Sequence, residues 1–304
     1  MQLAFSTCWN SVRHVRGDTM LQEIADLGFT RVELGQGIRR SLLEGIDRFV
    51  ADHQMTITNL LNYCPLPGDE SPTELDRFHC LSRREEDRQR AQTWTYRTID
   101  YAAKLGAQAV LVHLGSVPLP PFNARLIHRI GSGHYLDRGY VRLKLAAIRK
   151  REAIHCYQRA LDWLYPVFEH ARSSGVRLGV ENRFGIETFP SEQEFRRLFQ
   201  DITDDSLGYW HDFGSAQIRH NLTFVDHAEW LGEMAPRLIG CHVHDVQFPD
   251  RDHLPIFSGM IPFRELLKKV PAGIPLVWEL DPRVPNAEVA KALRVWNKTF
   301  ASVV

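Results

Sequence analysis

The chain has 304 residues, of which 44% are apolar and 24% are charged, and such a composition can bury a large core. Lys plus Arg and Asp plus Glu number 37 each, so no overall positive charge favours nucleic acid or an anionic membrane. The five cysteines include no C-x-x-C pair, which argues against a disulfide framework and a structural zinc site. No basic segment precedes an apolar signal core, and no apolar run reaches membrane-spanning length. We therefore expect a cytoplasmic protein.

Short apolar segments recur along the chain, and each is followed by a stretch with helical spacing. In chain order they are residues 2–7, 30–34, 56–61, 109–114, 177–181, 207–212, 238–244 and 275–280. Several are almost continuously apolar, such as AVLVHL and PLVWEL, which is typical of strands covered on both faces. We predict eight strands at these positions.

The stretches between the strands predict amphipathic helices, for example over residues 20–29, 98–107 and 192–202. Ser191 precedes the last of these and Glu194 follows it three positions on, which is a capping box. Repeated strand and helix imply right-handed crossovers, and no G-x-G-x-x-G follows the first strand as it would in an open dinucleotide-binding sheet. We predict an α/β fold, a single (β/α)8 TIM barrel domain over residues 1–304.

Two connections are unusually long, at residues 62–82 and 115–140. Both follow a strand, so they belong to the barrel face where such enzymes place their sites. We expect a lid, a specificity loop or a contact of a homo-oligomer there.

Side chains alternate along a strand, which assigns a direction to each polar residue. In the seventh and eighth segments the apolar neighbours face the helices, so His242, His244 and Glu279 point into the barrel. Glu181 ends the fifth segment and Asp212 ends the sixth at the same height. We therefore expect four ligands, Glu181, Asp212, His242 and Glu279, to meet at one end of the barrel.

Three carboxylates and one imidazole suit one divalent metal ion, with Mn²⁺, Mg²⁺ or Co²⁺ favoured and Zn²⁺ as an alternative. Buried carboxylates without a partner would cost several kcal/mol, roughly, or become protonated. Other interpretations stay open: Glu181 and Glu279 as structural salt-bridge partners, Asp212 as a turn former before Gly214, and His242 as a hydrogen-bonded core histidine.

Further inward polar residues are candidate substrate contacts. His113 and Glu33 lie in the fourth and second segments, and either a substrate contact or a structural hydrogen bond would explain them. Arg183 and His244 border the proposed ligands and could orient hydroxyls, or a phosphate in the case of Arg183. The basic stretch 142–152 has no interleaved aromatics, and we interpret it as the solvated face of a helix.

Six short motifs follow one another along nearly the whole chain. They read VEL at 32–34, LGAQAVLVHLG at 105–115, GVENR at 179–183, HDFGSA at 211–216, HVHD at 242–245 and WELD at 278–281. With them the sequence resembles the xylose-isomerase-like superfamily of sugar-phosphate isomerases and epimerases, which also contains the endonuclease IV group. The resemblance implies a metal held by a Glu, an Asp, a His and a Glu on strands five to eight. These roles carry over to Glu181, Asp212, His242 and Glu279.

One position departs from the family pattern. The sixth strand usually reads D-x-G-H, whereas Ser215 stands here in place of the histidine. Members often hold substrate with that histidine, so the substrate class does not transfer. The endonuclease IV relatives need it as a zinc ligand, so a multi-zinc nuclease is disfavoured, and so is nucleic acid as a partner.

The resulting hypothesis is a metal-dependent sugar or sugar-phosphate isomerase or epimerase. Such an enzyme moves a proton next to a carbonyl through an enediolate, and Glu181 and Glu279 are the catalytic candidates. The substrate would be a small sugar or polyol. The alternatives are a keto-polyol (inosose-type) dehydratase, then an endonuclease IV-like phosphodiester hydrolase, then a non-catalytic polyol-binding barrel.

Overall fold

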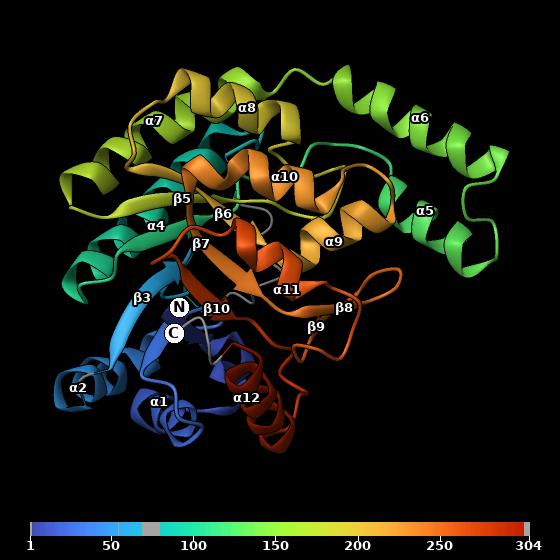
Figure 1. Cartoon of the computed structure of the whole chain (residues 1–304). Coiled ribbons are helices and arrows are strands. Elements are labelled where there is room, and N and C mark those ends of the chain that lie inside the picture. The colour runs from blue at the N-terminus through green and yellow to red at the C-terminus, as the bar shows by residue number, and fades with distance from the viewer. Residues whose placement is uncertain (1, 54, 69–79, 301–304) are drawn as a thin grey trace.

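A closed barrel of parallel strands forms the centre of the protein in a computed structural model, which describes residues 2–53, 55–68 and 80–300 (Figure 1). The barrel strands are β1 (Gln2–Ser6), β2 (Arg31–Leu34), β3 (Thr56–Leu61), β4 (Ala109–Val112), β5 (Arg177–Glu181), β6 (Leu207–Asp212), β7 (Leu238–Val243) and β10 (Pro275–Trp278). Their order around the barrel is β1-β10-β7-β6-β5-β4-β3-β2, and the pairing of β1 with both β2 and β10 closes it. The predicted (β/α)8 barrel is therefore confirmed.

All eight predicted strands are present, and several bounds differ by one or two residues. β1, β4, β7 and β10 end earlier than predicted, and β2 begins one residue later. The pairing stops where the chain turns away from its neighbour, whereas the apolar pattern continues into that turn. As a result His113, His244 and Glu279 lie just beyond the ends of β4, β7 and β10.

Helices surround the barrel (Figure 1). They are α1 (Gly17–Asp26), α2 (Leu43–His53), α4 (Glu85–Lys104), α5 (Phe122–Gly131), α6 (Arg138–Glu152), α7 (Tyr157–Ser173), α8 (Glu192–Asp201), α9 (Phe213–Asn221), α10 (His227–Met234), α11 (Phe263–Leu266) and α12 (Asn286–Phe300). Short 3-10 turns are η1 (Thr7–Trp9), η2 (Ser11–Arg13), η3 (Arg40–Leu42), η4 (Ala235–Arg237) and η5 (Leu267–Lys269). The predicted capping box of Ser191 and Glu194 begins α8. Among the described helices, none combines the length and apolarity needed to span a bilayer.

Two insertions stand out from the regular alternation. The antiparallel hairpin of β8 (Asp245–Gln247) and β9 (Arg251–Leu254) follows β7 directly. The predicted long connection at 115–140 contains α5 and the start of α6, which form a helical hairpin at the side of the barrel (Figure 1). Residues 69–79 of the other long connection lie outside the described residues.

The core has two layers, as the alternation along the strands predicts. Cys241 and Val243 belong to the large apolar cluster that also contains helix residues such as Ile24 and Leu164. The barrel interior is filled by a separate cluster from the strands: Ala4, Leu61, Ala109, Leu111, Trp210, Ile239 and Val277. A Cβ at Gly240 would lie 1.8 Å from the Trp210 ring, so only glycine leaves room there for the indole.

Candidate metal centre

Four side chains meet at the C-terminal ends of neighbouring strands. Glu181 ends β5, Asp212 ends β6, His242 lies in β7 and Glu279 follows β10. One ligand atom from each lies within 4.8 Å of all the others. The register explains this, because Asp212 pairs with His242 and His242 pairs with Val277, two residues before Glu279. The structure thus brings together the four residues that the sequence assigned to a metal.

His242 is surrounded by carboxylates. Its Nδ1 lies 2.5 Å from Glu181 Oε1 and 3.3 Å from Glu279 Oε2, and its Nε2 lies 2.6 Å from Glu33 Oε2. Burial lowers the pKa of this imidazole. The nearby charges of Glu279, Glu33 and Glu181 raise that pKa by more than burial lowers it, so the pKa lies well above its usual value. So much negative charge in a buried place favours a cation beyond the imidazolium itself.

Glu181 and Glu279 both remain ionised. Burial raises the pKa of Glu181, but the His242 charge and hydrogen bonds from His242 and His113 outweigh it, so that pKa lies well below its usual value. Burial likewise acts against the Glu279 carboxylate, yet His242 and His253 lower its pKa to about 2. Ionised carboxylates and an imidazole nitrogen are the donors that divalent cations take, so these residues fit such an ion.

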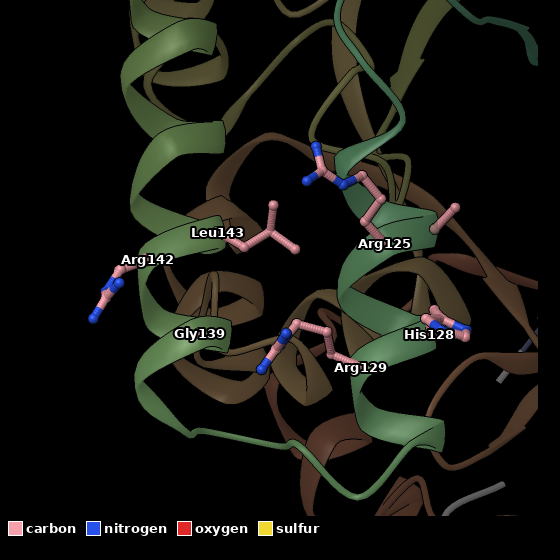
Figure 2. Close-up of a pocket in the computed structure, with 7 residues that line it drawn as sticks. Arg125, His128, Arg129, Gly139, Arg142 and Leu143 are labelled. Carbon is pink, nitrogen blue, oxygen red and sulfur yellow. The ribbon is translucent and has the colours of Figure 1, made fainter.

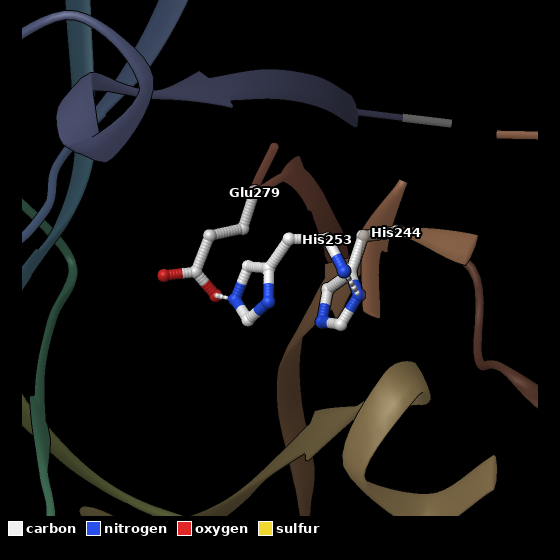
Figure 3. Close-up of side chains that lie close together, drawn as sticks. All are labelled: His244, His253 and Glu279. Atoms are coloured by element: carbon white, nitrogen blue, oxygen red, sulfur yellow. Dashed lines mark hydrogen bonds and ion pairs between the residues drawn. The ribbon is translucent and has the colours of Figure 1, made fainter. Parts of the chain in front are cut away.

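A second group of three side chains, His244, His253 and Glu279, is equally compact (Figure 3). The rings of His244 and His253 are stacked, with centroids 4.1 Å apart and planes 10° apart. His244 Nδ1 accepts a hydrogen bond from the backbone N of His253 at 2.9 Å. Because ring nitrogens direct their lone pairs in the ring plane, two stacked rings are poorly placed to share one ion. The group containing Asp212 fits a single ion better.

Asn182 holds the backbone of Asp212 through both its N–H and its C=O. Asn182 accepts from Asp212 N at 2.8 Å and donates through Nδ2 to Asp212 O at 3.1 Å. The Asp212 carboxylate also begins α9, because its Oδ1 accepts from Ser215 N at 2.5 Å. Asp212 therefore caps α9 through one oxygen, and it also lies close to the other three candidate ligands. Asn182 had no sequence signal beyond its place in GVENR.

A cavity of about 150 Å³ opens beside the four residues. Its lining includes His113, Arg183, Ser215, Asp252 and His253. His113 Nε2 lies 2.5 Å from Glu181 Oε2, and Arg183 Nη1 lies 2.6 Å from His113 Nδ1. Two of the predicted substrate contacts thus reach the cavity.

The other two predicted substrate contacts lie deeper. His244 is fully buried, with its Nε2 3.2 Å from Asp212 Oδ2. A Cβ at Gly214 would lie 1.9 Å from the His244 ring, so glycine is required beside it. Glu33 is also fully buried and is absent from the cavity lining, where it would need to be for a direct substrate contact.

His253 is a cavity residue that sequence reasoning missed. It lies on β9 with φ of 53°, which is rare for a residue with a side chain. Its Nδ1 is 3.1 Å from Asp252 Oδ1 and its Nε2 is 3.7 Å from Glu279 Oε2. Burial lowers its pKa, but these two carboxylates raise it well above the usual value. The alternation rule covered only strands of the barrel, and a hairpin carries this histidine.

A roomier cavity of about 630 Å³ lies between α5 and α6 (Figure 2). Arg125, Arg129 and Arg142 line it, together with His128 and Leu143. Arg129 is bound to Asp137 by two contacts of 2.8 Å, and the lining contains no carboxylate. Among the described residues, this lining therefore has no counterpart to Glu181, Asp212 and Glu279 of the smaller cavity.

Comparison with known proteins agrees with the barrel fold. The family model described as "Xylose isomerase-like TIM barrel" matches residues 21–299. Among curated protein sequences, none matches this chain.

Several solved structures share the fold. A D-tagatose 3-epimerase-like protein is similar with a TM-score of 0.70 and 18% identity, over 100% of this chain and 98% of that one. The E. coli 3-keto-D-glucoside 4-epimerase YcjR has a TM-score of 0.67 and 14% identity, over 98% and 99% of the two chains. The IolI protein, solved with a zinc atom, has a TM-score of 0.64 and 12% identity, over 99% and 97%.

Proposed function

The chain belongs to the xylose isomerase-like TIM barrel family, and from this premise we propose that it is a divalent-metal-dependent isomerase or epimerase of a sugar or sugar phosphate. The observation that carries the proposal is the meeting of Glu181, Asp212, His242 and Glu279 within 4.8 Å beside a cavity. One of the similar structures is named a sugar epimerase, and another is named a sugar epimerase-like protein. Both names support the same class of reaction.

One divalent cation would be held by these four side chains. The set is rich in oxygen, which favours Mn²⁺, Mg²⁺ or Co²⁺, and the zinc in the IolI structure keeps Zn²⁺ as an alternative. When bound, such an ion supplies positive charge that stabilises negative charge developing on substrate oxygens.

Glu181 and Glu279 are the proposed acid–base pair. Isomerising or epimerising a ketose requires removal of a proton from a carbon next to a carbonyl and its return elsewhere. Both carboxylates are ionised, so either can accept that proton and hold it as a carboxylic acid. In an isomerisation the same group can return the proton to the neighbouring carbon. In an epimerisation the opposite face receives a proton from the other carboxyl group, which must first have taken one up from solvent. Both residues line the cavity, which places them within reach of one small substrate.

His113, Arg183 and His253 are the proposed substrate contacts, since each lines the cavity. His113 and Arg183 offer N–H donors beside Glu181, and His253 offers one beside Glu279. His244 supports His253 through the stacked rings and the hydrogen bond to its backbone. The cavity volume of about 150 Å³ is small compared with drug-sized sites of roughly 300–1,000 Å³. We therefore expect a substrate of monosaccharide or cyclic-polyol size.

Solvent exchange tests this function directly. Metal-loaded protein is incubated in D₂O with a panel of ketoses and inososes, and NMR measures deuterium entering a C–H position. Wild-type protein should exchange at least one compound, whereas Glu181→Gln and Glu279→Gln should each lose about 10²-fold or more, because Gln cannot accept a proton at neutral pH.

Metal content is measured in each sample, so that a chemical defect is distinguished from metal loss. Glu233→Gln, an exposed change on α10, is the control and should exchange at the wild-type rate. If both active-site variants exchanged as fast as wild type with full metal, the two-carboxylate mechanism would be wrong. A metal-loaded wild type that exchanged nothing in the panel would favour the non-catalytic barrel.

A further inference from the structure

Glu33 lies on the opposite arc of the barrel from His242, and the two side chains meet across its interior. β2 and β7 are separated in the strand order by β1 and β10 on one side and by the four strands β3 to β6 on the other. Glu33 Oε2 nevertheless lies 2.6 Å from His242 Nε2, and both side chains are 0% exposed. A contact this short between two fully buried groups has a fixed geometry.

Two neighbouring strands hold the Glu33 carboxylate in place. Ser6 Oγ donates to Glu33 Oε1 at 2.6 Å, and Asn59 Nδ2 donates to Glu33 Oε2. Asn59 is held in turn, because its Oδ1 accepts from Thr58 Oγ1 at 2.7 Å. Ser6 and Asn59 are the direct register partners of Glu33 on β1 and β3.

A register shift makes this arrangement. Val32 pairs with Ile57, so regular pairing would place Thr58 opposite Glu33, but an irregularity after Val32 places Asn59 there instead. Asn59 has the same parity as Leu61, which belongs to the interior cluster, so it points inward like Glu33. The bulge thus aligns an inward amide with an inward carboxylate.

The contact decides which nitrogen of His242 is free. Both oxygens of Glu33 already act as hydrogen-bond acceptors, toward Ser6 and Asn59. The His242 nitrogen that faces this acceptor therefore carries a hydrogen when a metal takes the other nitrogen. That leaves the lone pair on Nδ1, the atom that faces Glu181 and Glu279. Histidines that bind metals commonly donate their second N–H to a carboxylate, which orients the ring and strengthens the ligand.

We propose that Glu33 is a positioning residue of the metal centre, which orients His242 through Nε2 so that Nδ1 binds the ion. This rests on the proposed metal binding and replaces the substrate contact expected from the sequence. Ser6 and Asn59 keep the carboxylate in place, so the support for one ligand spans β1, β2, β3 and β7.

Metal affinity tests the assignment without relying on catalysis. Calorimetric titration with Mn²⁺ should show roughly 10–100-fold weaker binding by Glu33→Gln than by wild type, the range for loss of such a supporting partner. Gln has nearly the shape of Glu, so this variant should fold even if Glu33→Ala does not. Ser6→Ala, which removes one support of the carboxylate, should weaken binding less than Glu33→Gln.

A matched control separates orientation from charge. Asp252→Asn likewise replaces a carboxylate by an amide, but Asp252 lines the cavity and contacts His253 and not His242. In Zn²⁺-loaded protein with ¹⁵N-labelled histidine, the buried Nε2–H of His242 should give a slowly exchanging downfield proton signal. We expect Glu33→Gln to move this signal upfield, because a neutral acceptor makes a weaker bond, and Asp252→Asn to leave it unchanged.

The outcomes distinguish this inference from the proposed function. If Glu33→Gln bound Mn²⁺ as wild type does, or lost no more affinity than Asp252→Asn with the proton signal unmoved, the positioning role would be overturned. If wild-type protein bound none of Mn²⁺, Mg²⁺, Co²⁺ and Zn²⁺, the metal centre and this inference would fall together. A wild type that bound metal but exchanged no substrate proton would overturn only the proposed catalysis.

Discussion

The Asp212 carboxylate caps α9 and is also a proposed metal ligand, and substitution can separate these two roles. Asp212→Ala removes the N-cap of α9 as well as a proposed ligand, so it should lower the free energy of unfolding by about 1 kcal/mol and reduce metal content. Asp212→Asn keeps a cap of equal quality but loses the charge. We expect it to unfold like wild type in EDTA while binding Mn²⁺ more weakly.

Urea unfolding in EDTA and metal analysis after dialysis measure the two effects independently. Full metal content in Asp212→Asn and Asp212→Ala would show that Asp212 is not a ligand. Equal unfolding free energies for Asp212→Ala and wild type would show that the cap contributes nothing to α9.

The sequence was sufficient to place the four candidate ligands but not all of their partners. Alternation along β7 and β10 predicted that His242 and Glu279 point inward, and strand ends predicted the height of Glu181 and Asp212. The contact of Glu33 with Asn59 depends on a register shift between β2 and β3, which no local sequence pattern predicts. His253 was missed because the β8–β9 hairpin follows no barrel periodicity.

The sequence predicted strands and helices where the apolar residues repeat with a strong period. It predicted the ends of these elements less accurately. The capping box of α8 fixed its start at the expected residue, because Ser191 and Glu194 satisfy each other's backbone N–H groups. The connection at 115–140 was expected to form a lid, a specificity loop or a contact, and it contains α5 and the start of α6. α5 has a clear apolar face that includes Phe122 and Leu126, which the search for strand–helix units passed over, whereas α6 is only weakly amphipathic.

The layer outside β6 contains a buried pair of histidines that makes stability depend on pH. His211 Nε2 lies 3.0 Å from His227 Nε2, and His227 Nδ1 lies 3.0 Å from Gln217 Oε1. Burial, with a smaller contribution from His220, lowers the pKa of His227 to about 3. Since the unfolded chain takes up this proton near pH 6.5, wild-type protein should lose stability as pH falls from there toward 3, by at most about 1.4 kcal/mol per pH unit from this group.

His227→Gln keeps hydrogen-bonding groups but cannot titrate. Urea unfolding at pH 7.5 and pH 5.0 should therefore show a smaller loss of stability on acidification for the variant than for wild type. The same loss in both proteins would mean that His227 does not contribute to the pH dependence.

Closure of the barrel connects the site to the folding of the entire chain. The four proposed ligands come from the ends of β5, β6, β7 and β10, which are consecutive around the barrel, while Glu33 reaches His242 from the other arc. Eight strand–helix units could be counted in the sequence, and their number and the absence of a glycine-rich first turn predicted closure. The register in which β1 pairs with β10 and β2 could not be predicted from the sequence, because it depends on packing inside the barrel.

A metal that binds only the closed barrel must stabilise it. Strand pairing brings the four proposed ligands together, so the unfolded chain has no comparable site. An ion at 100 times its Kd should therefore add about 2.7 kcal/mol to the free energy of unfolding. For a chain of this size that corresponds to a rise in Tm of several degrees, roughly 2–4 °C per kcal/mol. Differential scanning calorimetry with Mn²⁺ and then with excess EDTA should show the rise and its reversal.

His242→Ala should abolish the rise, because it removes the ligand that Glu33 orients and leaves the other three without the imidazole. Glu233→Gln changes a residue of α10 that is not a proposed ligand, and this variant should keep the rise in Tm. An unchanged wild-type Tm with Mn²⁺, Mg²⁺, Co²⁺ and Zn²⁺ would contradict a metal site in the barrel. An equal rise in His242→Ala would instead assign the ion to another group, and His244, His253 and Glu279 would be the first to test, because their ligand atoms are equally close together.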